Sequence, residues 1–259
     1  NITTNYTYDL IGRISGMTTS DGLRLSLKYD DKNRVEKYVW QIGDKSYTTN
    51  YFYGKTPDGA IAKPGLIYGL SINNSLNLDY TYDSLGRRTQ RTLGSYVQNY
   101  EYLPGAADNS TTTLISKIDT NGIGKNYEYQ YDDLGNIKTV KENGAIAVTY
   151  NYDSLGQLTQ EHNYINNIVM QYSYDSSGNI TSKQEYIYDG QLIGPFDTIE
   201  YTYDGTWKDK LVTYDGETIT YDAIGNPLQY RGGMSFDWES GRQLASVTKS
   251  GASLAQYSY

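Results

Sequence analysis

Carboxylates are the most abundant side chains in this sequence with an obvious capacity for chemistry. The chain has 30 Asp and Glu residues, one histidine and no cysteine. Without cysteine there is no thiolate nucleophile, disulfide or zinc–thiolate site, and the single histidine, His162, excludes a multi-histidine metal site. Catalysis or metal binding would therefore have to depend on carboxylates, as in glycosidases or calcium sites.

Six aspartates recur in one local context, which favours a structural role over a catalytic one. Each follows an aromatic residue and precedes a glycine by three residues, so each can cap its own turn. A glycosidase needs two unlike carboxylates, one with a raised pKa, and a repeated acid offers no such pair. We therefore predict no enzyme activity, no catalytic residue, no metal site and no cofactor. The six are Asp9, Asp83, Asp132, Asp153, Asp175 and Asp222.

These aspartates belong to a repeated motif: Tyr-Asp, two variable residues, Gly, a polar residue and then usually an apolar one. The second copy has Asn in place of Gly, and the last copy begins with Phe and has one extra residue. We predict that the motif residues form the turns of a structural repeat. They are Tyr8, Asp9, Gly12, Tyr29, Asp30, Asn33, Tyr82, Asp83, Gly86, Tyr131, Asp132, Gly135, Tyr152, Asp153, Gly156, Tyr174, Asp175, Gly178, Tyr221, Asp222, Gly225, Phe236, Asp237 and Gly241.

The chemistry of one copy predicts a β-hairpin. Tyrosines often stand two residues apart before the turn, as at Tyr150 and Tyr152, which places their rings on one face of a strand. Asp opens a type I turn, and the following Gly supplies the positive φ of a G1 bulge. Counting decayed copies at Tyr53-Gly54 and at 102–105, the unit is roughly 20 to 29 residues long, as in stacked repeat proteins.

The composition agrees with such an array. The chain has 30 tyrosines among 259 residues but only 3 Phe and 3 Trp, so the core must be built largely from tyrosine. Each ring then needs a partner for its hydroxyl, which suits a sheet. The net charge of −8 argues against a nucleic-acid partner, and no apolar run is long enough for a membrane span. His162 is expected in a solvated strand or loop. We predict one all-β array of antiparallel hairpins over residues 1–259.

The repeated Tyr-Asp-x-x-Gly-[Asn/Arg]-[Ile/Leu] unit resembles the YD repeat of the RHS-repeat proteins. This family includes bacterial polymorphic toxins, wall-associated proteins, the C components of insecticidal toxin complexes and the teneurins. The resemblance covers essentially the whole chain, from Tyr8 to Tyr259. The segment 205–216 also resembles a stretch found late in such arrays. Between Tyr29 and Tyr131 the unit is longer and more variable than the regular family pattern.

The resemblance implies a curved spiral of hairpins wound into a hollow β-shell that encloses a C-terminal toxic or signalling segment. The implied partners are the rest of the parent shell and this payload, and the implied location is secreted or at the bacterial cell surface or wall. The family's self-cleaving aspartyl site carries Asp-Pro motifs. This sequence has no Asp-Pro dipeptide, so we expect it to be a fragment of a larger protein that stops before that element.

Two other functions fit parts of the pattern. Exposed tyrosines would allow a binding or adhesion module that recognises glycans or a surface protein, because flat rings stack on sugar faces. A glycoside hydrolase or lyase on a β-solenoid would instead need an unlike pair of carboxylates, which the repeated context does not provide. The terminal strands also have no polar caps, so we expect edge-to-edge self-association of the chain.

Overall fold

The computed structural model describes residues 2–54, 63, 65–121 and 123–259, and it contains strands and turns but no helix in these ranges. The chain divides into two compact units. The first comprises Asn1–Tyr129 with Lys141–Ala145, and the second comprises Gln130–Val140 with Ile146–Tyr259. The predicted all-β class is confirmed.

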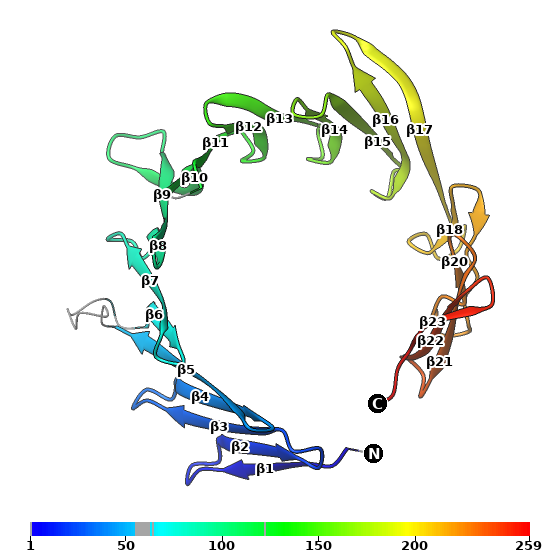
Figure 1. The fold of residues 1–259 in the computed structure, drawn as a ribbon. Coiled ribbons are helices and arrows are strands. Elements are labelled where there is room, and N and C mark those ends of the chain that lie inside the picture. The colour runs from blue at the N-terminus through cyan, green and yellow to red at the C-terminus, as the bar shows by residue number, and fades with distance from the viewer. Residues whose placement is uncertain (1, 55–62, 64, 122) are drawn as a thin grey trace. The chain divides into compact units, whose positions relative to one another are not determined.

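Strands β1 to β11 cover the first part of the chain (Figure 1). Their bounds are β1 Thr4–Tyr8, β2 Ile14–Thr19, β3 Arg24–Tyr29, β4 Val35–Ile42, β5 Lys45–Tyr53, β6 Ile67–Ile72, β7 Leu76–Tyr82, β8 Arg88–Leu93, β9 Tyr96–Pro104, β10 Thr111–Asn121 and β11 Lys125–Tyr131.

Strands β12 to β23 follow in the same manner. Their bounds are β12 Ile137–Glu142, β13 Ala145–Tyr152, β14 Leu158–Asn163, β15 Ile168–Tyr174, β16 Ile180–Tyr188, β17 Leu192–Tyr203, β18 Leu211–Tyr214, β19 Glu217–Thr218, β20 Gln229–Tyr230, β21 Met234–Glu239, β22 Gln243–Lys249 and β23 Ala252–Gln256. The last four form a separate sheet.

The pairing is antiparallel and joins strands that follow one another in the sequence. In the first unit β1 pairs with β2, β2 with β3, and so on to β10 with β11. In the second unit the described pairs run from β13 with β14 to β18 with β19, and from β20 to β23. The array of antiparallel hairpins predicted from the motif is therefore present in each unit.

Several repeat turns carry a break in the strand register at the tyrosine. Tyr8 pairs with Ile14, and the register shifts between Thr7 and Tyr8. The same shift occurs at Tyr29, Tyr82, Tyr152 and Tyr174. Such a shift is the mark of a β-bulge, in which two residues of one strand oppose one residue of the other. The predicted turn with a bulge is confirmed.

Few apolar side chains are buried among the described residues. Those with less than a tenth of their surface exposed are Tyr68, Ala147, Val169 and Ile219. Buried polar side chains are at least as common: Thr49, Ser71, Thr120, Thr139, His162 and Asn226. Such a fold must depend on hydrogen bonds more than an ordinary two-layer domain does, because burial of apolar surface is the usual dominant stabilising contribution.

Candidate functional site

One carboxylate oxygen closes the backbone of each repeat turn. In the turn that begins at Asp175, Oδ1 accepts the backbone N–H groups of Ser177 and Asn179 at 2.8 and 2.9 Å. The backbone N–H of Gly178 donates to the carbonyl of Asp175 at 3.1 Å. The same two contacts to Oδ1 recur in the turns that begin at Asp9, Asp30, Asp83, Asp132, Asp153 and Asp222.

The residue three positions after each of these aspartates has left-handed backbone geometry. The φ angles are 83° at Gly12, 63° at Asn33, 86° at Gly86, 85° at Gly135, 77° at Gly156, 88° at Gly178 and 87° at Gly225. The prediction of positive φ at these glycines is confirmed. Asn33 takes the position because, after glycine, asparagine is among the residues that enter this region most readily.

The second carboxylate oxygen binds the side chain four residues further on. That side chain is Arg13, Arg34, Arg87, Asn136, Asn179 or Asn226. Several of these side chains also reach the following turn. Arg13 Nη1 donates to Asn33 Oδ1 at 2.6 Å, and Asn226 Nδ2 donates to the carbonyl of Gly241 at 2.6 Å. One aspartate therefore organises its own turn and positions the group that connects this turn to the next.

The arginines at this position also cover the tyrosine of the following repeat. The guanidinium carbons of Arg13, Arg34 and Arg87 each lie 4.2 Å from the ring centroids of Tyr29, Tyr53 and Tyr102, in that order. A cation over an aromatic face adds an attraction of about 0.5–1 kcal/mol at exposed sites. In the first unit the carboxylate, the guanidinium and the next ring thus form one connected series.

The repeat tyrosine donates its hydroxyl to the backbone of the preceding repeat. The acceptor is the carbonyl of the residue that restarts the strand after the previous turn. The hydroxyl–carbonyl distances are 2.7 Å for Tyr29 to Ile14, 2.6 Å for Tyr82 to Ile67, 2.8 Å for Tyr102 to Arg88, 2.9 Å for Tyr152 to Ile137, 2.7 Å for Tyr174 to Leu158, 3.0 Å for Tyr203 to Ile180 and 2.7 Å for Tyr221 to Leu211. We call this series the tyrosine ladder.

The surroundings of Asp175 and Asp132 favour the ionised carboxylate, and those of Tyr152 favour the protonated hydroxyl. The side-chain hydrogen bond from Asn179, with the backbone N–H groups of the turn, lowers the pKa of Asp175. The hydrogen bond from the Asn136 side chain is the largest cause of the lowered pKa of Asp132. Burial raises the pKa of Tyr152, and the negative charge of Asp132 raises it further. Each group is therefore held in the protonation state that its hydrogen bonds require.

The last predicted copy of the motif is displaced. Phe236 and Asp237 lie inside β21, and Asp237 accepts a hydrogen bond from Ser246 at 2.7 Å instead of capping a turn. The prediction of a turn at Phe236-Asp237 is therefore wrong. The turn lies two residues later, where Ser240 and Gly241 have φ angles of 47° and 87°.

Trp238, which was not predicted as a repeat residue, takes the tyrosine position of that repeat. Its indole Nε1 donates to the carbonyl of Pro227 at 2.7 Å. Pro227 is the residue that pairs with Tyr221 after the preceding turn, so the acceptor is the one a ladder tyrosine would use. The pairing of Trp238 with Leu244, six residues on, repeats the pairing of Tyr8 with Ile14. In the sequence, an aromatic residue six positions before the apolar residue that restarts the strand is the signal that would have identified Trp238.

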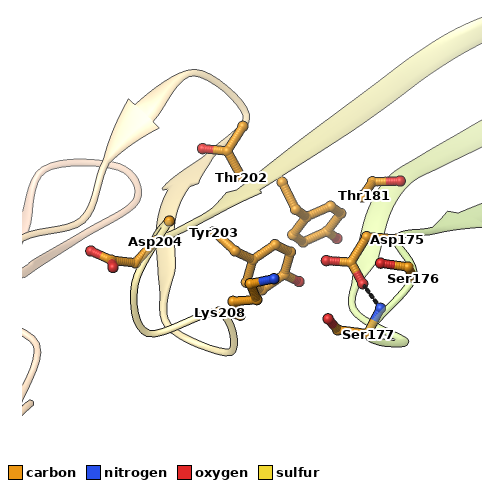
Figure 2. Close-up of a pocket in the computed structure, with 10 residues that line it drawn as sticks. Asp175, Ser176, Ser177, Thr181, Thr202, Tyr203, Asp204 and Lys208 are labelled. Atoms are coloured by element: carbon orange, nitrogen blue, oxygen red, sulfur yellow. Dashed lines mark hydrogen bonds between the residues drawn. The ribbon is translucent and has the colours of Figure 1, made fainter.

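A pocket of about 390 Å³ lies in the second unit between the turns of Asp175 and Asp204. Figure 2 shows the two aspartates on either side, with Tyr203 between them. Both carboxylates are engaged: Asp204 Oδ1 accepts the backbone N–H groups of Thr206 and Trp207 at 2.9 and 2.8 Å. The hydrogen bonds from Trp207 and Thr206 lower the pKa of Asp204, as those of its own turn do for Asp175. The general acid of a glycosidase needs a raised pKa so that it stays protonated. The pKa of both carboxyls here is lowered instead.

Within residues 2–54, 63, 65–121 and 123–259, no group of three or more His, Cys, Asp or Glu side chains is arranged to hold a metal ion. None of the described residues forms a helix with the length and apolar character needed to cross a membrane.

No protein-family profile matches the chain, and no curated protein matches it in sequence. Solved structures do match it. A crystal structure of TcdB2-TccC3 has a TM-score of 0.70 at 17% identity, over 95% of this chain and 14% of that chain. A structure of the Photorhabdus luminescens Tc holotoxin pore with the TccC3-D651A mutation has a TM-score of 0.56 at 18% identity, over 95% of this chain and 12% of that chain.

At these identities the similarity is one of fold. It agrees with the all-β fold that the turn motif predicted. This chain corresponds to 14% or less of either matched chain, so the activities and partners of the complete proteins do not follow from the match.

We predict that Gly156→Val destabilises the protein by more than about 1 kcal/mol, whereas Gly156→Asn costs clearly less. Gly156 has φ of +77° and no atom within 4 Å of the position a Cβ would take, so the penalty is backbone strain and not a clash. Urea denaturation would measure both variants. Equal stability of the two would show that positive φ does not limit this position.

We also predict that the protein loses stability in acid because of its turn aspartates. The pKa of Asp132 is lowered from 3.8 in the folded state, so the unfolded chain binds the proton first. The stabilisation is present above about pH 4 and is lost as the pH falls through the folded-state pKa.

Asp132→Asn should reduce the slope of melting temperature against pH in this range. Asp133→Asn, a change at the adjacent exposed aspartate, should not. An unchanged slope in Asp132→Asn would contradict the assignment.

Proposed function

We propose that this chain forms a stretch of wall in the β-shell of a larger YD-repeat toxin-type protein that encloses a C-terminal payload. The observation that carries the proposal is the match over 95% of this chain to TcdB2-TccC3. The repeated turns support it, because the same Asp turn recurs along the chain and the same ladder contact joins successive units at several positions.

In this function the working parts are structural. The aspartate turns and the tyrosine ladder are used within the array, and we assign no catalytic residue to them. We treat residues 1–259 as one repeat array, with the rest of the parent shell and the payload as its partners. A parent of this kind would be secreted or located at the cell surface, as the Tc holotoxin resemblance suggests.

A glycan-binding function has support from one feature. Tyr6 and Tyr8 of β1 stand two residues apart and have 51% and 61% of their surface exposed. Two rings on one face of a strand could stack on a sugar. The ladder tyrosines are less suited to this role because their hydroxyls are bonded to backbone carbonyls.

The natural full-length protein tests the shell proposal through protection of the payload. We expect the segment after the repeats to resist protease in the unmodified protein. Gly156→Val, which strains one wall turn, should increase cleavage of that segment, while Gly156→Asn should leave it near the unmodified rate. Cleavage of the segment at one rate in all three proteins would contradict enclosure. Glycan binding that is lost in Tyr6→Ala/Tyr8→Ala, with no enclosed segment, would favour the adhesion function.

A further inference from the structure

His162 is the only histidine of the chain, and it is buried in β14. It retains 8% of its exposed surface, so the prediction of a solvated residue is wrong. Its Nε2 atom is buried and has no hydrogen-bond partner among the described residues. A buried polar atom without a partner is uncommon in folded proteins and asks for an explanation.

Two tyrosine rings enclose the imidazole. The ring of Tyr164 is stacked on it with centroids 3.7 Å apart and an interplanar angle of 19°. The ring of Tyr188 meets it edge-on at 4.3 Å and 62°. On the flanking strands, Thr149 of β13 and Val169 of β15 lie opposite His162 in register. Val169, with 1% exposure, is the most buried large side chain described.

Among the described residues of β13 to β16, no charged group shares a face with the imidazole. Across the strands, the register places Thr149, Val169 and Tyr186 on its face, and the hydroxyl of Tyr186 donates to Gln184. The nearest acids, Glu161 of β14 and Glu185 of β16, both lie in register with Met170 and so belong to the opposite face. The titratable groups that face His162 are therefore tyrosines, which stay neutral at physiological pH.

This environment favours the neutral imidazole. Burial lowers the pKa of His162. Protonation of the neutral ring leaves an N–H group on both nitrogens, so that Nε2 becomes part of a charged donor with no acceptor, in a site from which water is largely excluded. The stacked face of Tyr164 would attract the cation, but it offers no acceptor for the N–H group in the ring plane.

The two enclosing tyrosines lie at the ends of β14 and β16, the two strands that pair with β15. Tyr164 follows β14, and its backbone N–H donates to the carbonyl of Ala147 at 2.8 Å. Tyr188 ends β16, and its backbone N–H donates to Asn167 at 2.8 Å. Beyond Tyr188 lies the end of the long β16–β17 hairpin (yellow in Figure 1). This end carries exposed apolar side chains: Ile187, Leu192, Ile193 and Phe196.

We propose that His162 is a proton-sensitive latch that holds the turn after β14 and the end of the β16–β17 hairpin in place at neutral pH and releases both on acidification. Protonation makes the sandwiched ring a charged group that must reach solvent. When the ring leaves, Tyr164 and Tyr188 lose the imidazole against which they pack. The backbone hydrogen bond from Tyr188 to Asn167 then loses the side-chain packing that holds it in place. The latch adds regulation to the array and does not depend on the function proposed above.

The direction of the pH effect follows from linkage. A histidine whose folded-state pKa lies below its unfolded value stabilises the fold fully above the unfolded pKa of about 6.5. This contribution is lost as the pH falls from there through the folded-state pKa. The stabilisation by the turn aspartates is lost only below about pH 4. The two effects therefore occupy separate pH ranges.

The single histidine makes the titration unambiguous. The His162 ring signals of the unmodified protein, followed by NMR from pH 8 to pH 4.5, should titrate below the ordinary histidine value. Amide hydrogen exchange, corrected for its intrinsic pH dependence, should become about tenfold faster or more at 163–168 and 186–193 between pH 7.5 and pH 5. Exchange in the β1–β4 region serves as an internal reference and should not change over this range.

His162→Phe provides the matched variant, because it keeps an aromatic ring between the tyrosines and removes the proton site. Its exchange in both segments should be independent of pH over the same range, whereas Asp132→Asn should retain the pH-dependent opening. A His162 pKa at or above the ordinary value would overturn the latch. So would an acid-induced opening of these segments that persists in His162→Phe. The titration of the unmodified protein decides the question even if the variant does not fold.

Discussion

The hydrogen bond from a tyrosine hydroxyl to a backbone carbonyl of the preceding repeat is the contact on which this fold depends. Only four apolar residues are largely buried among those described: Tyr68, Ala147, Val169 and Ile219. Where it is present, the ladder adds one side-chain bond across the junction, and the ring that donates it also fills space on the sheet face. A tyrosine-rich composition is what such an array requires.

The aspartate turns supply the geometry that makes the ladder regular. A carboxylate that accepts two backbone N–H groups fixes the turn, and the glycine at positive φ sets the bulge that follows. The bulge fixes the register and so brings the carbonyl that restarts the strand within reach of the hydroxyl that forms the ladder bond. In this arrangement each acid is satisfied locally, which explains why its repetition produces no unlike pair of carboxylates.

Much of this could be read from the sequence because turn chemistry is local. Tyr-Asp-x-x-Gly predicted the hairpins, the bulges and the positive φ angles. The ladder could not be read, because its acceptors are backbone carbonyls such as that of Ile137, whose side chain carries no sign of the bond. Trp238 was missed because an indole N–H replaced the hydroxyl. His162 was misplaced because its burial comes from Tyr164 and Tyr188, and one of these lies 26 residues away in the sequence.

The most direct test of the ladder is the stability of Tyr152→Phe, which removes the hydroxyl bonded to Ile137 and keeps the ring. The loss of this bond should lower the free energy of unfolding by about 1 kcal/mol, since the carbonyl loses its side-chain donor. Tyr47→Phe, at an exposed tyrosine of β5, should change it by less than about 0.5 kcal/mol. Urea denaturation under identical conditions compares the two. Equal stability of Tyr152→Phe and the unmodified protein would contradict the central role of the ladder.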